Sequence, residues 1–362
     1  MKLGFLLVLL LPIAGQAYVS WRVWQLLPCA AALKATVVVL MALAFVCLFA
    51  NFVLPVKRMP LWLSQTFYEI GTSWPMILLY LFMLFGVLDL GRLCHVVPAS
   101  FVRGNWAGTF AVLGVMLACF VGGNIHYHHK HRQQLTIDSH SKLTRPLKVV
   151  MLSDLHLGFH NRRAEFARWV DLVNAEQPDL ILIAGDIIDS NVYPLLKEDV
   201  AQEWRRLKAP VYACLGNHEY FAGEPRARQF IEQAGIHLLR DSAAVVGELC
   251  IIGRDDRSNP HRSALADIVA STGLNGKFSI VLDHQPNHLE EAEQCGIDFQ
   301  LSGHTHRGQI WPISWITDRL FECSHGQWQR GATRYYVSSG IGIWGGKFRI
   351  GTRSEYVVAT IN

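Results

Sequence analysis

Carboxylate, imidazole and amide side chains recur in this chain wherever a short apolar run ends. The run Val149–Leu152 is followed by Asp154 and His156, and later runs end in the same way. Short apolar runs are typical of buried strands in a parallel sheet, and ligand sites in such sheets lie beyond the carboxyl ends of the strands. We therefore expect one site at one sheet edge, built from Asp154, His156, Asp186, Asn217, His218, His284, His304 and His306.

Side chains of these types suit a pair of divalent metal ions. Carboxylates and neutral imidazoles are good ligands for Mn, Fe and Zn. Each motif alone is weak, because an Asp-x-His pair occurs by chance and a single buried histidine is more often hydrogen-bonded in a core. Gly185, Gly216 and Gly303 each precede a ligand, and we expect them to allow tight turns that aim the ligands inward.

Taken in order, these motifs resemble those of the calcineurin-like metallophosphoesterases over residues 147–361. The resemblance implies an α/β domain with a β-sandwich flanked by helices and two divalent ions (Mn, Fe, Zn or Mg). One ion would be bound by Asp154, His156, Asp186 and His306, and the other by Asp186, Asn217, His284 and His304. The implied reaction is in-line attack on phosphorus by a hydroxide held between the metals. His218 matches the family's catalytic histidine, which binds no metal and stabilises or protonates the leaving oxygen.

Three further residues have roles that the resemblance suggests. Asp189 would orient ligands through hydrogen bonds. Arg307 stands where the bacterial membrane-associated branch of the family usually has glycine, and it would contact phosphate or point to solvent. Arg349, in the tail that resembles this branch, would contact a phosphate or headgroup or have a surface role. The resemblance does not separate monoester, diester and pyrophosphate cleavage.

The elements that position these residues alternate between strand and helix, which favours an α/β fold over residues 147–362. The expected strands are 148–153, 179–184, 210–215, 248–253, 278–283, 298–301, 334–339 and 355–361. The expected helices are 162–175, 196–207, 225–234, 262–270 and 287–294.

The first 125 residues have a different character. Only nine of the 62 charged residues (33 basic plus 29 acidic) precede Gly123, and the whole chain is 51% hydrophobic. Ala35–Leu54, Ile70–Leu88 and Gly104–Ile125 are uncharged and long enough to cross a bilayer. Leu3–Tyr18 is either a fourth transmembrane helix or a cleaved signal peptide. We expect four transmembrane helices in residues 1–125, and hence a multi-pass protein of a bacterial inner membrane.

Residues 126–146 are basic and rich in histidine, and we expect a linker there. The histidines form either a metal-binding tract or, as we favour, a collar that faces anionic headgroups. Basic residues near the helix ends, among them Lys57 and Arg58, favour a cytoplasmic catalytic domain by a narrow margin.

The partners follow from composition and from one apolar segment. A net charge of +4 and the lack of a basic and aromatic module argue against nucleic acid. The eight cysteines contain no C-x-x-C pair, which argues against a zinc ribbon.

The apolar segment from Trp311 to Trp315 is expected to be a loop that dips into membrane lipids and admits a lipid-linked phosphate. The alternatives are a soluble substrate and a non-catalytic scaffold or sensor; the oligomeric state is left open.

Overall fold

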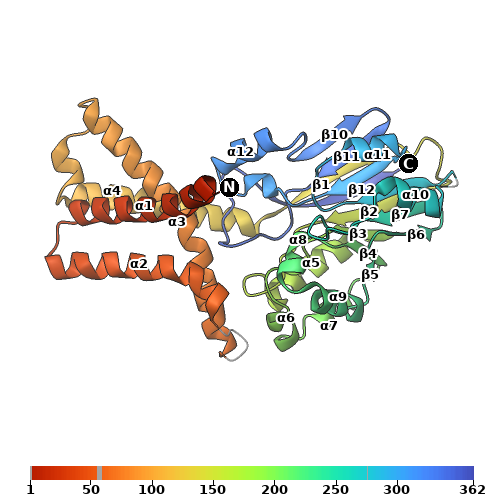
Figure 1. The fold of residues 1–362 in the computed structure, drawn as a ribbon, viewed down its shortest axis with the longest axis horizontal. Coiled ribbons are helices and arrows are strands. Elements are labelled where there is room, and N and C mark those ends of the chain that lie inside the picture. Colours follow the sequence, from red (N-terminus) through yellow and green to blue (C-terminus); the bar gives the residue numbers. More distant parts are fainter. Residues whose placement is uncertain (1, 55–58, 275) are drawn as a thin grey trace. The chain divides into compact units, whose positions relative to one another are not determined.

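The computed structural model describes residues 2–54, 59–274 and 276–362 (Figure 1). The chain divides into two compact units. The first comprises Met1–Ile125 with Gly345–Lys347, and the second comprises His126–Trp344 with Phe348–Asn362. The division between the units falls after Ile125, except for the short segment Gly345–Lys347.

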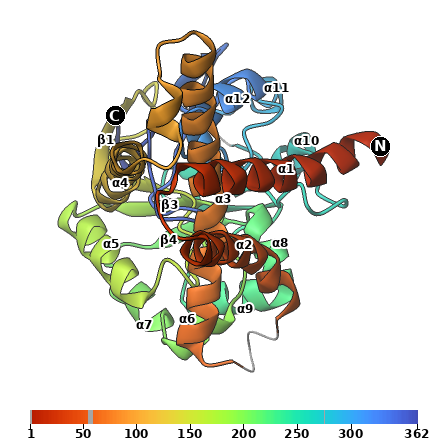
Figure 2. The same ribbon diagram turned by 90° about the vertical axis from the view of Figure 1, so that its left-hand side faces the viewer.

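Helices make up the first unit: α1 (Lys2–Leu26), α2 (Ala31–Val53), α3 (Leu61–Leu93), the short 3-10 helix η2 (Ala99–Val102) and α4 (Trp106–His128). Figure 2 views α2 and α4 nearly end-on. Gly71 allows α3 to approach α2 closely, because a Cβ atom there would lie 2.5 Å from the carbonyl oxygen of Cys47. Small residues play this part where helices pack in a membrane.

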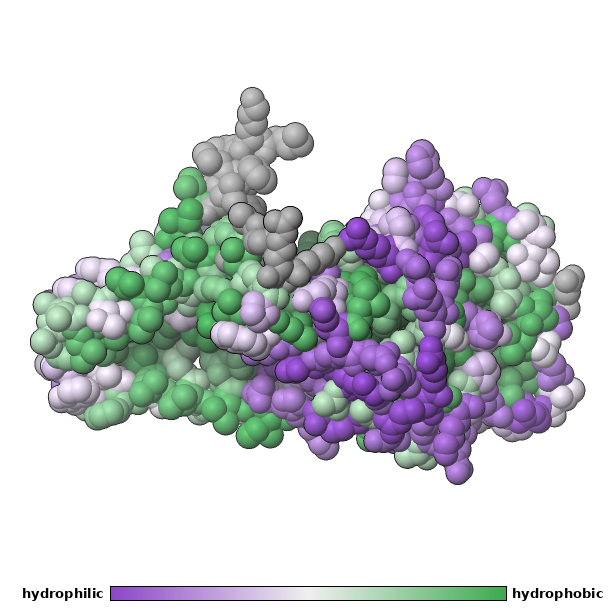
Figure 3. Space-filling view, turned by 90° about the horizontal axis from the view of Figure 1, so that it is seen from below, coloured by the Kyte–Doolittle hydropathy of each residue, from purple (hydrophilic) through white to green (hydrophobic). Residues whose placement is uncertain are grey.

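Within the residues that the structure describes, three helices are long and apolar enough to cross a membrane: α2 over Ala31–Phe49, α3 and α4. On the face that Figure 3 shows, the first unit is largely hydrophobic, whereas hydrophilic residues are frequent on the second unit. Residues 3–18 lie within the continuous helix α1, which is not one of the three, so the fourth span stays a prediction. Lys57 and Arg58, which entered the prediction of orientation, lie outside the described residues.

The second unit contains two six-stranded mixed sheets among the residues described. The first has the order β1 (Lys130–Ile137), β12 (Ser354–Ile361), β2 (Leu147–Leu152), β3 (Leu180–Ala184), β4 (Val211–Cys214) and β5 (His237–Leu238). The second has the order β10 (Gly326–Arg330), β11 (Thr333–Val337), β9 (Phe299–Ser302), β8 (Phe278–Leu282), β7 (Leu249–Gly253) and β6 (Ser242–Val246). Strands β2 to β5 run parallel, as do β7, β8, β9 and β11.

Alternation along the strands builds the layers of this unit. Val149 and Met151 of β2 lie in a core shared by the two sheets, while Val150 and Leu152 face the opposite side. There they pack with α5 (Arg163–Ala175), α6 (Tyr193–Lys197), α7 (Ala201–Trp204) and α9 (Glu224–Gln233), which Figure 1 shows grouped on one side of the strands. The outer face of the second sheet packs with α10 (Leu265–Thr272) and α11 (Glu290–Gln294).

Each expected strand is present within two residues of its expected bounds, and the α/β sandwich is confirmed. The expectation of a linker at 126–146 needs correction, because β1 pairs with β12 in parallel from Lys130 to Ile137 and closes one edge of the first sheet. Only Leu135 and Ile137 of β1 point into the core, so the strand lacks an apolar run that the sequence could reveal.

Two other segments differ from expectation. Residues 313–320, partly covered by the expected loop, form helix α12 (Ile313–Leu320), which begins directly after Pro312. A proline fits at a helix start because the first helical N–H groups need no partner within the helix. The helix expected at 196–207 is instead split into α6 and α7.

Candidate metal centre

The predicted ligands all follow strands whose carboxyl ends lie at the same edge. Asp154 and His156 follow β2, Asp186 follows β3, and Asn217 begins the short helix α8 (Asn217–Phe221) after β4. From the second sheet, His284 follows β8, and His304 and His306 follow β9, in a stretch that includes the 3-10 turn η3 (His306–Gly308). Parallel strands therefore deliver ligands from both sheets to one place, as expected from the sequence.

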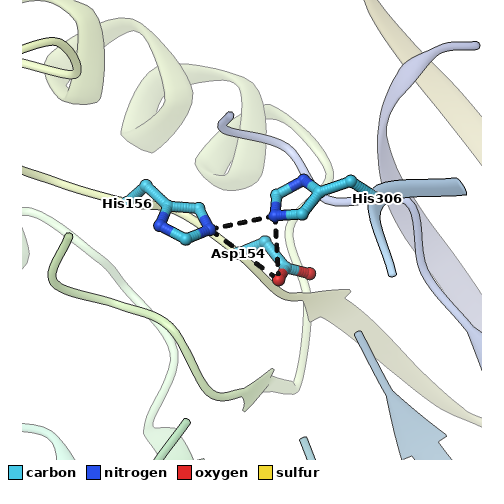
Figure 4. A group of neighbouring side chains, drawn as sticks. All are labelled: Asp154, His156 and His306. Atoms are coloured by element: carbon cyan, nitrogen blue, oxygen red, sulfur yellow. Dashed lines mark hydrogen bonds and ion pairs between the residues drawn. The ribbon is translucent and has the colours of Figure 1, made fainter. Parts of the chain in front are cut away.

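One group of ligand atoms comes from Asp154, His156 and His306 (Figure 4). The Nε2 atoms of the two imidazoles are 3.0 Å apart, and Asp154 Oδ1 lies 3.4 Å from His306 Nε2. All three side chains are buried. Burial, helped by His156 and Arg349, holds the pKa of His306 well below its ordinary value, so this imidazole is neutral and can offer a lone pair.

A second group comes from Asp186, His284 and His304, with Asn217 beside them. His284 Nε2 lies 3.1 Å from Asp186 Oδ2 and 3.2 Å from Asn217 Oδ1. His304 Nδ1 lies 2.9 Å from the same amide oxygen. Burial lowers the pKa of His304 to about 4, which keeps this ring neutral as well.

Asp186 joins the two groups. Its Oδ2 is 3.6 Å from His156 Nε2 in the first group as well as 3.1 Å from His284 Nε2 in the second. Burial would raise the pKa of Asp186, but the imidazoles of His284, His218 and His156 outweigh it and hold that pKa well below its ordinary value. An ionised carboxylate within reach of imidazoles of both groups is the arrangement that a bridging ligand requires.

The spacing of the ligand atoms fits bound divalent cations. The Nε2 atoms of the buried His156 and His306 side chains converge to 3.0 Å, the spacing that ligands of one metal ion adopt when each bond is about 2.1 Å long. Without a cation, converging lone pairs and buried carboxylates are costly. Asp154, His156, Asp186 and His306 could hold one ion, and Asp186, Asn217, His284 and His304 the other.

Backbone strain is concentrated on the ligands themselves. Asp154, His156, Asp186, His304 and His306 have φ between 45° and 70°, in the left-handed region that non-glycine residues rarely adopt. Such conformations persist only where the surroundings impose them, and they gather at functional sites.

The glycines before the ligands act differently from the sequence-based expectation at two of three positions. Gly185 does have a positive φ, of 74°. At Gly216 the φ is −114°, and a Cβ there would lie 2.2 Å from Asp186 Oδ1. At Gly303 a Cβ would lie 2.4 Å from Asp154 Oδ2. Gly216 and Gly303 are therefore required for space beside a ligand carboxylate.

Hydrogen bonds behind the ligands set their orientation. His284 Nδ1 donates to the carbonyl of Ala184 at 2.8 Å, which leaves Nε2 for the site. Asp189 lies between two imidazoles, with Oδ1 3.4 Å from His156 Nδ1 and 3.2 Å from His218 Nδ1. This is the position that an orienting residue, as suggested for Asp189, would occupy.

Glu219 was not singled out from the sequence, although it adjoins His218. It is fully buried, and its carboxylate accepts hydrogen bonds from the N–H groups of Gly216 (2.6 Å), Ile188 (2.8 Å) and Asp186 (3.2 Å). Glu219 therefore ties together the turns after β3 and β4. The sequence did offer one indication of this role. Glu219 is the third residue of α8, and a glutamate at that position of a helix often accepts a hydrogen bond from the backbone N–H at the helix start.

The two arginines near the site differ in burial. Arg307 is exposed and lies in η3 with a φ of 49°. Arg349 is fully buried, so the surface role considered for it is wrong. Its guanidinium donates to the carbonyls of His306 (2.8 Å), Ser339 (2.5 Å) and Gly342 (3.1 Å), and so connects the last ligand to the loop after β11.

Comparison with known proteins gives a consistent result. Residues 147–308 match the family described as calcineurin-like phosphoesterase. A Campylobacter jejuni metallophosphoesterase is 33% identical over 226 residues, 60% of this chain and 60% of that protein. A zebrafish (Danio rerio) protein, described as a transmembrane protein with metallophosphoesterase domain, is 28% identical over 321 residues, 82% of this chain and 73% of its own length.

An Aquifex aeolicus metallophosphoesterase is 30% identical over 227 residues, which make up 59% of this chain and 85% of that protein. The match therefore includes most of a whole relative. The family match over residues 147–308 covers the strands and turns that carry the ligands described above. On this similarity, and on the family match over residues 147–308, the chain belongs to the calcineurin-like metallophosphoesterases.

Proposed function

We propose that this chain is a membrane-anchored, metal-dependent phosphohydrolase that cleaves a phosphodiester or pyrophosphate bond in a lipid-linked substrate. The hydrolytic part rests on one observation, the two groups of ligand atoms joined by Asp186. Two divalent cations bound there would supply an activated water and neutralise charge on the phosphoryl group. Around them, the chain's own residues orient the ligands and provide a proton.

His218 is the residue that would provide the proton. Its Nδ1 lies 3.1 Å from the carbonyl oxygen of Asp189 and 3.2 Å from Asp189 Oδ1, which leaves Nε2 to donate. Burial would lower the pKa of His218, but the charges of Asp186 and Asp189 outweigh it and raise that pKa to about 9. A protonated His218 can then give its proton to the leaving oxygen.

The lipid-linked substrate is supported by α12. Trp315, Ile316 and Leu320 of this helix are all exposed, with Trp315 at 63%. The helix begins close to the His306 turn, because a Cβ at Gly308 would lie 2.4 Å from the backbone nitrogen of Ser314. Amphipathic helices with exposed tryptophan and aliphatic residues bind at the membrane interface. Such a helix beside the ligands could present a lipid phosphate to them.

The membrane anchor is supported by α2, α3 and α4, and we include α1 as a fourth span. We further propose the bacterial inner membrane as the location, with the metal centre on the cytoplasmic side.

The test is hydrolysis by the detergent-purified chain, stripped of metal and then supplied with Mn. A lipid-linked diphosphate in mixed micelles is compared with a soluble aryl phosphodiester. We expect faster cleavage of the lipid substrate, and no cleavage of either by the metal-stripped protein. Asp186→Ala is the inactive reference: it removes the bridging carboxylate and should reduce metal-dependent hydrolysis to background, while circular dichroism shows that the protein is still folded.

Each part of the proposal has its own contrary result. Equal or better cleavage of the soluble ester would reject the lipid-linked substrate and leave the helices as an anchor. Full activity in Asp186→Ala would reject the metal centre. Two bound metals without cleavage of either substrate would favour a scaffold or sensor.

A further inference from the structure

The last turn of α4, residues His126 to His128, belongs to the second unit, although the rest of the helix belongs to the first. Tyr127 in this turn is fully buried. Its hydroxyl oxygen lies 2.7 Å from Asn161 Oδ1 and 2.7 Å from Glu165 Oε1. Lys130 Nζ lies 3.5 Å from the centre of its ring. A phenol buried this deeply, with two polar partners, has a fixed position.

Asn161 connects Tyr127 to the first ligand turn. It is fully buried, and its side-chain amide donates to the carbonyls of Leu155 (2.9 Å), His156 (3.1 Å) and Ile343 (3.2 Å). An asparagine amide has an oxygen that only accepts and a nitrogen that only donates. Because the three backbone carbonyls only accept, they fix the amide nitrogen toward the ligand turn. The amide oxygen then faces the hydroxyl of Tyr127, which can donate to it.

The contact with His156 matters because this ligand has a strained backbone, with a φ of 45°. A left-handed conformation at a non-glycine residue must be imposed by its neighbours. The Asn161 amide imposes it from one side by bonding the carbonyl of His156 and that of the preceding residue. On the other side, the backbone N–H of His156 donates to the carbonyl of Asp186 at 2.9 Å.

We propose that Tyr127 is a positioning residue of the metal centre, and that its hydroxyl, by bonding the Asn161 amide oxygen, holds this side chain where its nitrogen bonds the His156 turn. This inference rests on the proposed function, since it requires His156 to bind a metal. If the inference holds, the last turn of α4 supports the metal centre. The sequence did not suggest this role for residues 126–128.

The experiment uses the full chain in detergent and the variant Tyr127→Phe, which removes only the hydroxyl. Mn binding is measured by equilibrium dialysis, beside kcat, KM and the thermal unfolding midpoint. Tyr335→Phe is the matched control: Tyr335 is also buried, and its hydroxyl donates to the Leu289 carbonyl at 2.7 Å, away from the ligands. We expect both variants to unfold at a lower temperature, because each loses a buried hydroxyl that is hydrogen-bonded, to Asn161 and Glu165 for Tyr127 and to the Leu289 carbonyl for Tyr335.

Only Tyr127→Phe should weaken Mn binding and lower kcat, each by about tenfold, the lower end of the range for residues that orient metal ligands. Wild-type Mn affinity in Tyr127→Phe, or an equal loss in Tyr335→Phe, would overturn the proposal.

A second variant, Asn161→Asp, keeps the acceptor for Tyr127 but removes the amide donors. It should weaken Mn binding as well, and wild-type affinity in it would overturn the proposal even if Tyr127→Phe failed to fold. If the wild-type chain bound no Mn, the proposed function itself would fail.

Discussion

At the scale of single residues, several ligands are held by partners behind them. Asp189 faces His156 and His218, and the carbonyl of Ala184 sets the tautomer of His284. Glu219 holds the turns that carry Asp186 and Asn217 through three backbone N–H groups. Because five of the seven ligands have left-handed backbones, these outer contacts help to determine where the metal-binding atoms lie.

A pH dependence follows from His218, whose pKa is raised to about 9 by Asp186 and Asp189 against the effect of burial. A raised pKa means that His218 is protonated at neutral pH, so kcat should be lost as the pH rises through that pKa. Bound cations are positive and would move this alkaline limb to lower pH. The pH profile of kcat tests this, with His218→Gln as the comparison.

His218→Gln should retain its metals and lose the alkaline limb, with kcat reduced by roughly 10²–10⁴-fold, as for other general acids. An unchanged alkaline limb in His218→Gln would assign the titration to another group, and loss of metal would make His218 a ligand.

At the scale of secondary-structure elements, the site is a product of parallel strands that end together. Ligands from β2, β3 and β4 in one sheet meet ligands from β8 and β9 in the other. The turns are tight enough that Gly216 and Gly303 leave no space for a side chain. Helix α12 follows the last of these turns and carries its exposed apolar residues away from the core.

The interfacial role of α12 predicts a selective defect. Trp315→Ser removes the large exposed side chain that we expect to enter the membrane. It should raise KM for a lipid-linked substrate roughly tenfold, since burying such a side chain contributes about 1.5–3 kcal/mol. Cleavage of a soluble ester should not change. Trp328→Ser, on the exposed face of β10, is the matched control, because Trp328 is also exposed, at 42%. Equal effects of the two substitutions on the lipid substrate would contradict a special role for α12.

At the scale of the whole molecule, an apolar helical unit and a hydrophilic α/β unit share one chain that crosses between them more than once. The chain passes from the first unit to the second within α4 and returns briefly at Gly345–Lys347. The zebrafish relative, which has both a transmembrane description and a metallophosphoesterase domain in its name, matches 82% of this chain.

Orientation can be tested with a native cysteine. Cys94 is exposed in the turn after α3, and α4 separates it from the second unit. If α4 spans the membrane and the metal centre is cytoplasmic, a membrane-impermeant thiol reagent should label Cys94 in intact spheroplasts. Cys94→Ser should lose that label. Labelling of Cys94 that requires permeabilised membranes would place the metal centre on the outer side.

Much of this protein could be predicted from its sequence. Apolar runs ending in Asp154, Asp186 or His304 mark strand ends, because the change from apolar to polar residues can be recognised within a short stretch of sequence. Uncharged stretches of about 20 residues mark the helices of the first unit for the same reason. Order and residue type were therefore sufficient for the fold class and for the ligand set whose side chains the structure brings together.

Tertiary structure alone decided the rest. His156 and His306 are 150 residues apart in sequence and 3.0 Å apart in space, and Tyr127 reaches Asn161 across 34 residues. The polar strand β1, the burial of Arg349 and the contacts of Glu219 likewise depend on which surfaces pack together. Local sequence encodes periodicity and turns, whereas long-range contacts depend on the packing of the whole chain, and no single segment contains that information.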